Sequence, residues 1–128
     1  MRFLTPVLLA AALAAPPLLA RDKDPEAELA KMLAGRTPDK PTDCIPLYRT
    51  MSSTTIDRTA LVYEQGRTLY VNRFEGQCTL LDWTHIPVTK TPTGQLCRGD
   101  IVRMVDRTSG FMTGSCAFGP FQPYTKAK

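Results

Sequence analysis

The sequence predicts a mainly β protein, with one N-terminal helix followed by a small antiparallel sheet that curls into a barrel or a sandwich and carries two disulfides. Three observations lead to this prediction. Apolar residues follow a helical spacing only over residues 24–35. Beyond Cys44, short runs of β-branched and aromatic residues alternate with turns that contain Gly or Pro. Four cysteines, an even number, lie in this second region.

The first 20 residues are typical of a secretory signal peptide. Arg2 provides a positive start, the stretch Phe3–Ala15 is largely apolar, and Ala20 is a small residue before the expected cleavage. Cleavage after Ala14 is the alternative. We therefore predict export to the periplasm or the medium. We also predict no transmembrane segment after cleavage, because no other stretch approaches the ~20 apolar residues that a membrane-spanning helix needs.

A helix is expected at the start of the exported chain. Asp24 can cap it, Pro25 suits its first turn, and Gly35 is a natural stop. Leu29, Met32 and Leu33 form one apolar stripe, and the prolines of residues 36–43 indicate an extended linker. The predicted organisation is a signal peptide (1–20), the helix with its Pro-containing linker (21–43) and a small disulfide-stapled β domain (44–128).

Within the β domain, the clearest element is a hairpin. The run 54–63 and the run 68–72 flank a turn at 64–67 in which Gly66 can adopt a positive φ. Further along the chain we expect two weaker strands at 79–81 and 85–89 and a loop at 90–95. A strong strand at 101–106, a turn at 109–110 and a terminal strand at 116–124 are expected to follow. Pro120 and Pro123 favour an edge position for the terminal strand.

The four cysteines are expected to form two disulfides, because small exported domains gain stability from such cross-links. No Cys-x-x-C spacing occurs, so neither a zinc ribbon nor a thiol redox motif is indicated. We predict the pairs Cys78–Cys97 and Cys44–Cys116, on the expectation that the first and last strands of a curled sheet become neighbours. The competing arrangement is Cys44–Cys97 with Cys78–Cys116.

Candidate chemistry is confined to one short segment. His85 is the only histidine, and Asp82 lies three residues before it. No nucleophile motif accompanies them, so we predict no catalytic residue and interpret His85 as an ordinary strand-edge residue, dispensable for stability. One histidine without a free thiol supplies too few ligands for zinc, and the glycines form no phosphate loop, so no metal and no cofactor are predicted.

The charge pattern predicts no nucleic-acid partner, because the net charge is +4 and the basic residues are spread singly along the chain. The function predicted is that of a non-catalytic exported module that binds or supports an envelope protein or ligand through its sheet surface. The alternative is a small secreted hydrolase or enzyme inhibitor that uses the loops Asp82–His85 and Lys90–Gln95. The sequence leaves the oligomeric state open.

Several short segments are similar to one family. They are Asp43-Cys44-Ile45, Thr68–Asn72, Cys78, Gln95-Leu96-Cys97 with Asp100, and Cys116–Phe121. Together they resemble a domain of unknown function that occurs in small exported proteins of Gram-negative bacteria, with four cysteines, and the similarity extends over about residues 42–124. This resemblance implies export and the four-cysteine β fold, and it implies no reaction, cofactor or partner.

Overall fold

One helix and ten strands make up the part of the chain that the computed structural model describes, residues 24–48 and 51–127. The signal peptide predicted for residues 1–20 lies outside these residues. In chain order the elements are α1 (Pro25–Leu33), β1 (Arg36–Pro38), β2 (Cys44–Pro46), β3 (Ser52–Ile56), β4 (Ala60–Gln65), β5 (Thr68–Asn72), β6 (His85–Thr89), β7 (Gln95–Cys97), β8 (Ile101–Asp106), β9 (Met112–Ala117) and β10 (Phe121–Lys126).

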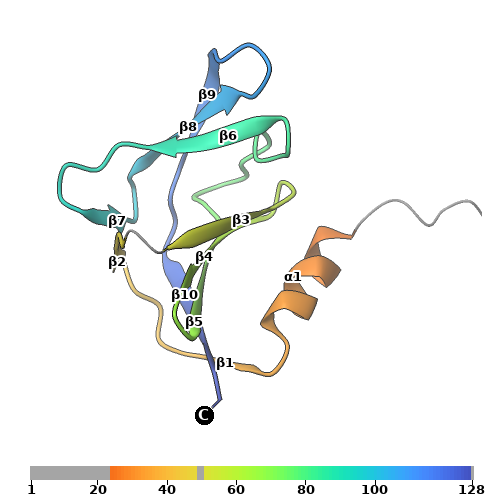
Figure 1. Ribbon diagram of the computed structural model, residues 1–128, viewed down its shortest axis with the longest axis vertical. Helices are drawn as coiled ribbons and strands as arrows, with labels where there is room; N and C mark the ends of the chain where they lie inside the picture. The colour runs from red at the N-terminus through yellow and green to blue at the C-terminus, as the bar shows by residue number, and fades with distance from the viewer. Residues whose placement is uncertain (1–23, 49–50, 128) are drawn as a thin grey trace, which may run out of the picture.

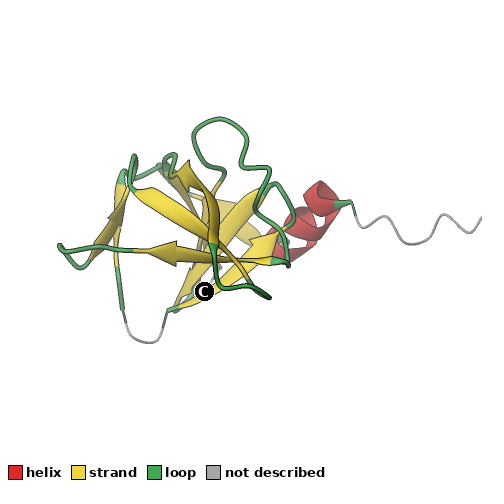
Figure 2. Cartoon of the chain, turned by 90° about the horizontal axis from the view of Figure 1, so that it is seen from above, coloured by secondary structure: helices red, strands yellow, loops and turns green. Residues whose placement is uncertain are grey.

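The strands form three antiparallel sheets. The largest has the order β1-β10-β5-β4-β3, a second has the order β6-β8-β9, and a two-stranded ribbon joins β2 to β7 (Figures 1 and 2). The predicted class is confirmed as mainly β with one helix, antiparallel sheets and two disulfides. Of the two shapes predicted, the sandwich fits, because the sheets do not close into a barrel.

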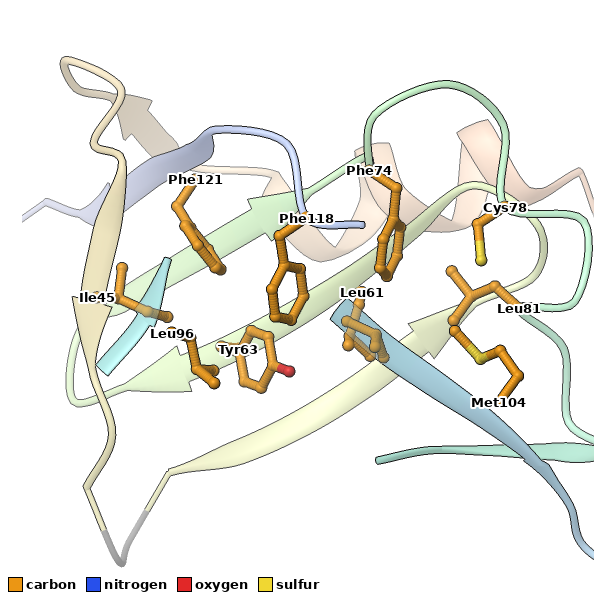
Figure 3. Close-up of a cluster of buried hydrophobic side chains, with 11 residues drawn as sticks. Ile45, Leu61, Tyr63, Phe74, Cys78, Leu81, Leu96, Met104, Phe118 and Phe121 are labelled. Carbon is orange, nitrogen blue, oxygen red and sulfur yellow. The ribbon is translucent and has the colours of Figure 1, made fainter. Parts of the chain in front are cut away.

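The main core lies between the five-stranded and the three-stranded sheets. Three phenylalanine rings stand in a row there, with Phe118 5.5 Å from Phe74 and 5.2 Å from Phe121 between ring centroids (Figure 3). Aromatic pairs at such separations add to the stabilisation that burial provides. The other core members come from both sheets, the ribbon and the loop before β6: Ile45, Leu61, Tyr63, Cys78, Leu81, Leu96, Val102 and Met104.

Helix α1 covers the opposite face of the five-stranded sheet. Asp24 caps the helix as predicted, since its Oδ1 accepts from the N–H of Glu26 at 3.0 Å. Leu29 is buried against a second apolar cluster that includes Val62 and Val71. Strand β4 is therefore covered on both faces, which explains why its run Ala60–Tyr63 is apolar at consecutive positions.

The predicted hairpin is confirmed as β4 and β5, joined at Gly66 (φ +58°) and Arg67. Strands β6 and β8 also have the predicted bounds. The run 54–63, however, divides into β3 and β4 around Arg58, whose φ is +52°. Residues 79–81 form turns in place of a strand, because the N–H of Leu81 bonds to the carbonyl of Cys78 and Leu81 itself fills the core.

The terminal region differs from its prediction. Residues 112–126 form two strands, β9 and β10, and β10 lies inside the five-stranded sheet between β1 and β5. The predicted linker contributes the real edge, β1. Pro123 is tolerated in this interior strand because its backbone faces β1 and not β5. At this position the neighbouring segment needs only an acceptor, and the Pro123 carbonyl accepts from the N–H of Asp39 at 3.0 Å.

The predicted cysteine pairing is wrong, and the competing arrangement is the one present. Cys44 bonds to Cys97, and Cys78 bonds to Cys116. The prediction placed the strand of Cys44 beside the strand of Cys116. Instead, β2 pairs with β7 in a register that sets Cys44 directly opposite Cys97, and β9, which carries Cys116, pairs with β8.

One buried polar side chain connects the end of β5 to the turn before β10. Asn72 is fully buried, donates from Nδ2 to the carbonyl of Gly119 at 2.8 Å, and accepts at Oδ1 from the N–H groups of Phe74 and Gly119. Its amide thus satisfies three backbone groups that are shielded from water. Gly119 leaves little room for a larger residue, because a Cβ there would lie 3.2 Å from the Phe74 backbone.

Candidate binding surface

The segment around the single histidine forms a hydrogen-bonded loop. Asp82 Oδ1 lies 2.9 Å from His85 Nδ1 and accepts from both the N–H and the hydroxyl of Thr84. The backbone N–H of His85 bonds to the Asp82 carbonyl at 3.2 Å. One carboxylate oxygen therefore holds the turn that leads into β6.

This arrangement braces a loop and does not resemble a proton relay. A relay places the acid on one ring nitrogen and the nucleophile on the other, whereas Asp82 and Thr84 both lie beside Nδ1. His85 is on an edge strand, as predicted, but its side chain is only 11% exposed. We therefore revise the expectation that His85 is dispensable for stability, since its removal would leave the Asp82 carboxylate short of one partner.

Acid should weaken this loop in a way that depends on Asp82. Partial burial acts to raise the pKa of Asp82, but the bonds from Thr84 and His85 outweigh it and hold the pKa below its ordinary value. A lowered folded-state pKa contributes stability above the ordinary pKa and loses it as the pH falls through the folded value. At pH 7 we expect Asp82→Asn to lower the free energy of unfolding by about 1–2 kcal/mol.

Urea unfolding at several pH values tests this expectation. The difference between the wild type and Asp82→Asn should begin to shrink as the pH falls through about 4, where Asp82 of the unfolded chain takes up a proton, and should be lost below the lower pKa of the folded state. A difference that stays constant from pH 7 to pH 2.5 would show that the carboxylate charge does not matter.

The two loops of the alternative enzyme or inhibitor hypothesis do not come together. Residues 82–84 precede β6 and residues 90–94 follow it. Because a strand rises about 3.3 Å per residue, the five residues of β6 separate the two loops by about 16 Å. The second loop is held separately, by a bond from Thr91 Oγ1 to the Gln95 carbonyl and by one from the Leu47 N–H to Gly94.

The outer face of the β6-β8-β9 sheet is strongly apolar. Along β8, Val102 and Met104 point into the core, so Ile101, Arg103 and Val105 point outward. Residues directly opposite one another in an antiparallel pair share a face, and the register therefore adds the outward residues of β6 and β9. We call this set the outer face: Ile86, Val88, Ile101, Arg103, Val105, Met112, Ser115 and Ala117.

Exposed apolar side chains of the described residues are concentrated on and around this face. Four of the eight large hydrophobic residues that are exposed belong to the outer face, and Trp83 and Phe111 lie in the turns at the end of the same sheet. The other two are Leu47 and Tyr48, which follow β2. Contiguous apolar surface of this kind usually marks a place where another molecule binds.

Arg103 is the one charged residue of the outer face. It lies opposite Val88 on β6 and opposite Ser115 on β9. A groove of about 440 Å³ begins beside it and is lined by Val88, Lys90, Asp100, Ile101 and Arg103. One carboxylate oxygen of Asp100 already has a hydrogen-bond donor, because Oδ2 accepts from the Cys97 N–H at 2.8 Å.

The free edge of β6 is poorly suited to accept another strand. The N–H of Arg107 bonds to the Thr84 carbonyl, so even-numbered residues of β6 direct their backbone groups toward β8. Odd-numbered residues then face the free edge, where Pro87 has no N–H and the N–H of His85 is used within its own turn. A proline at this position protects the β6 edge from pairing with another strand.

A second, smaller groove of about 260 Å³ lies between α1 and the loop before β6. It is lined by Glu28, Thr55, Asp57 and Trp83, a residue that is 78% exposed. Over residues 24–48 and 51–127, no three histidine, cysteine or acidic side chains gather as a metal site would require. All four cysteines are consumed by the disulfides. Among the described helical residues, no helix is long and apolar enough to cross a bilayer.

Sequence reasoning did not single out the outer face. Ile101–Val105 reads apolar at four of five positions, so alternation alone does not say which residues face the core. The one available signal was Arg103, a charge inside an apolar run.

Comparison of the chain with protein-family models, curated proteins and solved structures gives no significant match.

Proposed function

We propose that this protein is a non-catalytic exported module that binds another protein through the outer face of the β6-β8-β9 sheet. The observation that carries the proposal is the apolar outer face, which includes Ile86, Val88, Ile101 and Met112 in the exposed state. A monomer that leaves such a face in water gains stability when a partner covers it. The four-cysteine family resemblance remains a prediction and assigns no competing activity.

Export is supported by cysteine usage. Two disulfides persist in oxidising compartments such as the periplasm and are rare in a reducing cytosol. The Cys78–Cys116 disulfide also suits the proposed role, because it joins the loop before β6 to β9 and so helps to keep the outer face rigid, whereas Cys44–Cys97 joins the two strands of the ribbon. A rigid binding surface loses less conformational entropy on association.

Two matched substitutions test the proposal. Val88 and Leu47 are equally exposed, at 43%, but only Val88 belongs to the outer face. We expect Val88→Ser, alone or with Ile86→Ser, to reduce the amount of partner retained from an envelope extract about tenfold or more, since central interface residues contribute over ~1 kcal/mol each. Leu47→Ser should retain the wild-type set and amount of proteins.

Mass spectrometry of the retained proteins gives the measurement, and thermal melting of each variant confirms that the fold is kept. Equal retention by wild type and Val88→Ser would contradict the proposal. So would an equal loss with Leu47→Ser, because that result would indicate nonspecific apolar adsorption.

A further inference from the structure

We infer that the protein partner presents a carboxylate within an apolar surface, and that this carboxylate binds Arg103 with Lys90 beside it. This inference rests on the proposed function and names the chemistry of its partner. The observation behind it is the juxtaposition of Arg103 with outward aliphatic residues: Ile101 and Val105 on its own strand and Val88 on the neighbouring one.

Among residues 24–48 and 51–127, the Arg103 guanidinium has no carboxylate partner. The ion pairs of the described residues join Arg73 to Glu26, His85 to Asp82 and Arg98 to Glu75, and none of them includes Arg103 or Lys90. Both cations line the groove of about 440 Å³, and its one carboxylate, Asp100, already accepts a backbone bond. The groove therefore offers two positive groups for one negative group of a partner.

Covering the outer face removes water from Arg103, because aliphatic residues lie on three sides of it, Val88 on β6 and Ile101 and Val105 on β8, with Ser115 on the fourth. A charge that loses its water without gaining a partner strongly disfavours association. A partner that uses the apolar residues must therefore supply an acceptor, and a carboxylate matches the guanidinium fork with two parallel hydrogen bonds.

Charge complementarity distinguishes this partner from two other occupants. A second copy of the chain, packed face to face about a twofold axis, would bring two Arg103 side chains together, and like charges in an interface disfavour it. A lipid bilayer would have to accept Arg103 at the middle of the apolar area and not at its rim, which places a charge in the hydrocarbon layer. An acidic group on a protein surface avoids both difficulties.

The test compares Arg103→Gln and Arg103→Lys with Lys126→Gln, which removes one positive charge from the end of β10 on the other sheet. The apparent affinity for the partner retained by the wild type is measured by titration. We expect Arg103→Gln to weaken binding at least tenfold, Arg103→Lys to weaken it less, and Lys126→Gln to change it less than twofold. Arg103 is exposed, so melting should be unchanged.

A small probe examines the same chemistry without the partner. Sodium decanoate and decyltrimethylammonium, each below its micelle concentration, are titrated into the labelled protein while amide NMR signals are followed. Decanoate should shift the signals of residues 88, 101 and 103, the cationic probe should not, and Arg103→Gln should remove the effect.

The outcomes separate the two proposals. If Val88→Ser weakens partner binding but Arg103→Gln does not, the outer face binds the partner and the carboxylate inference is wrong. If neither variant changes binding, the proposed function is wrong and this inference falls with it. If decanoate binds but no protein is retained through the outer face, the ligand is a small anionic amphiphile and the inference of a protein partner is overturned.

Discussion

Replacing Asn72 with alanine is expected to lower the free energy of unfolding by about 3–5 kcal/mol. The substitution leaves the N–H of Phe74 and both backbone groups of Gly119 without the amide that now bonds to them. Each buried group that loses its partner costs about 1–3 kcal/mol. Because Asn72 is fully buried, water cannot replace the amide without opening the turn before β10.

Chemical denaturation of Asn72→Ala and of Gln122→Ala provides the measurement and its control. Gln122 also carries a bonded amide, which donates to the Asp39 carbonyl at 2.6 Å, but the residue is only half-buried. We expect Gln122→Ala to lower the free energy of unfolding by less than about 1 kcal/mol. Similar losses for the two variants would show that burial of the Asn72 network is not what stabilises this turn.

Removing the Cys78–Cys116 disulfide is expected to have a comparably large effect. Cross-links that close 38 and 53 residues contribute about 4 kcal/mol each, and the loop lengths alone favour the longer one by only about 0.3 kcal/mol. Cys78 is buried in the main core, whereas Cys44 and Cys97 are half-buried. Cys78→Ala/Cys116→Ala should therefore destabilise the protein more than Cys44→Ser/Cys97→Ser.

Urea unfolding of the two double variants decides the order, and non-reducing peptide mapping decides the pairing. The map should contain one peptide pair that joins Cys44 to Cys97 and one that joins Cys78 to Cys116. A pair that joins Cys78 to Cys97 would contradict the strand arrangement. An unchanged unfolding curve after full reduction would show that the disulfides add nothing to stability.

Local signals in the sequence were sufficient for several elements. Asp24 caps α1, Gly66 turns the β4–β5 hairpin, and strands β6 and β8 have the bounds that their composition predicted. Each of these features depends on residues that are close together in the sequence. It can therefore be predicted without knowing which distant segments of the chain it contacts.

Features that depend on distant partners were predicted less well. The cysteine pairing follows from which strands become neighbours, and the pairing of β2 with β7 brings together residues that are 53 positions apart. Pro123 suggested an edge strand because it lacks an N–H. In the structure its backbone faces residue 39, whose N–H needs only the Pro123 carbonyl as acceptor. The role of Asn72 likewise depends on Gly119, which is 47 residues away.

The candidate surface shows the same division. The acid and histidine at positions 82 and 85 do meet, as their spacing allowed, but they hold a turn. The outer face emerges only from the register, which shows that Ile86, Val88 and Ile101 share one side of a sheet whose other side is core. An apolar run cannot reveal this orientation, because both of its faces are apolar.

Site-specific photo-cross-linking tests the central claim most directly. A benzophenone amino acid is placed at position 88 on the outer face and, in a separate variant, at position 47, and each protein is irradiated in the producing cells. Covalent adducts with another protein should form from position 88 and not from position 47. Adducts from position 47 alone, or equal adducts from both positions, would contradict binding through the outer face.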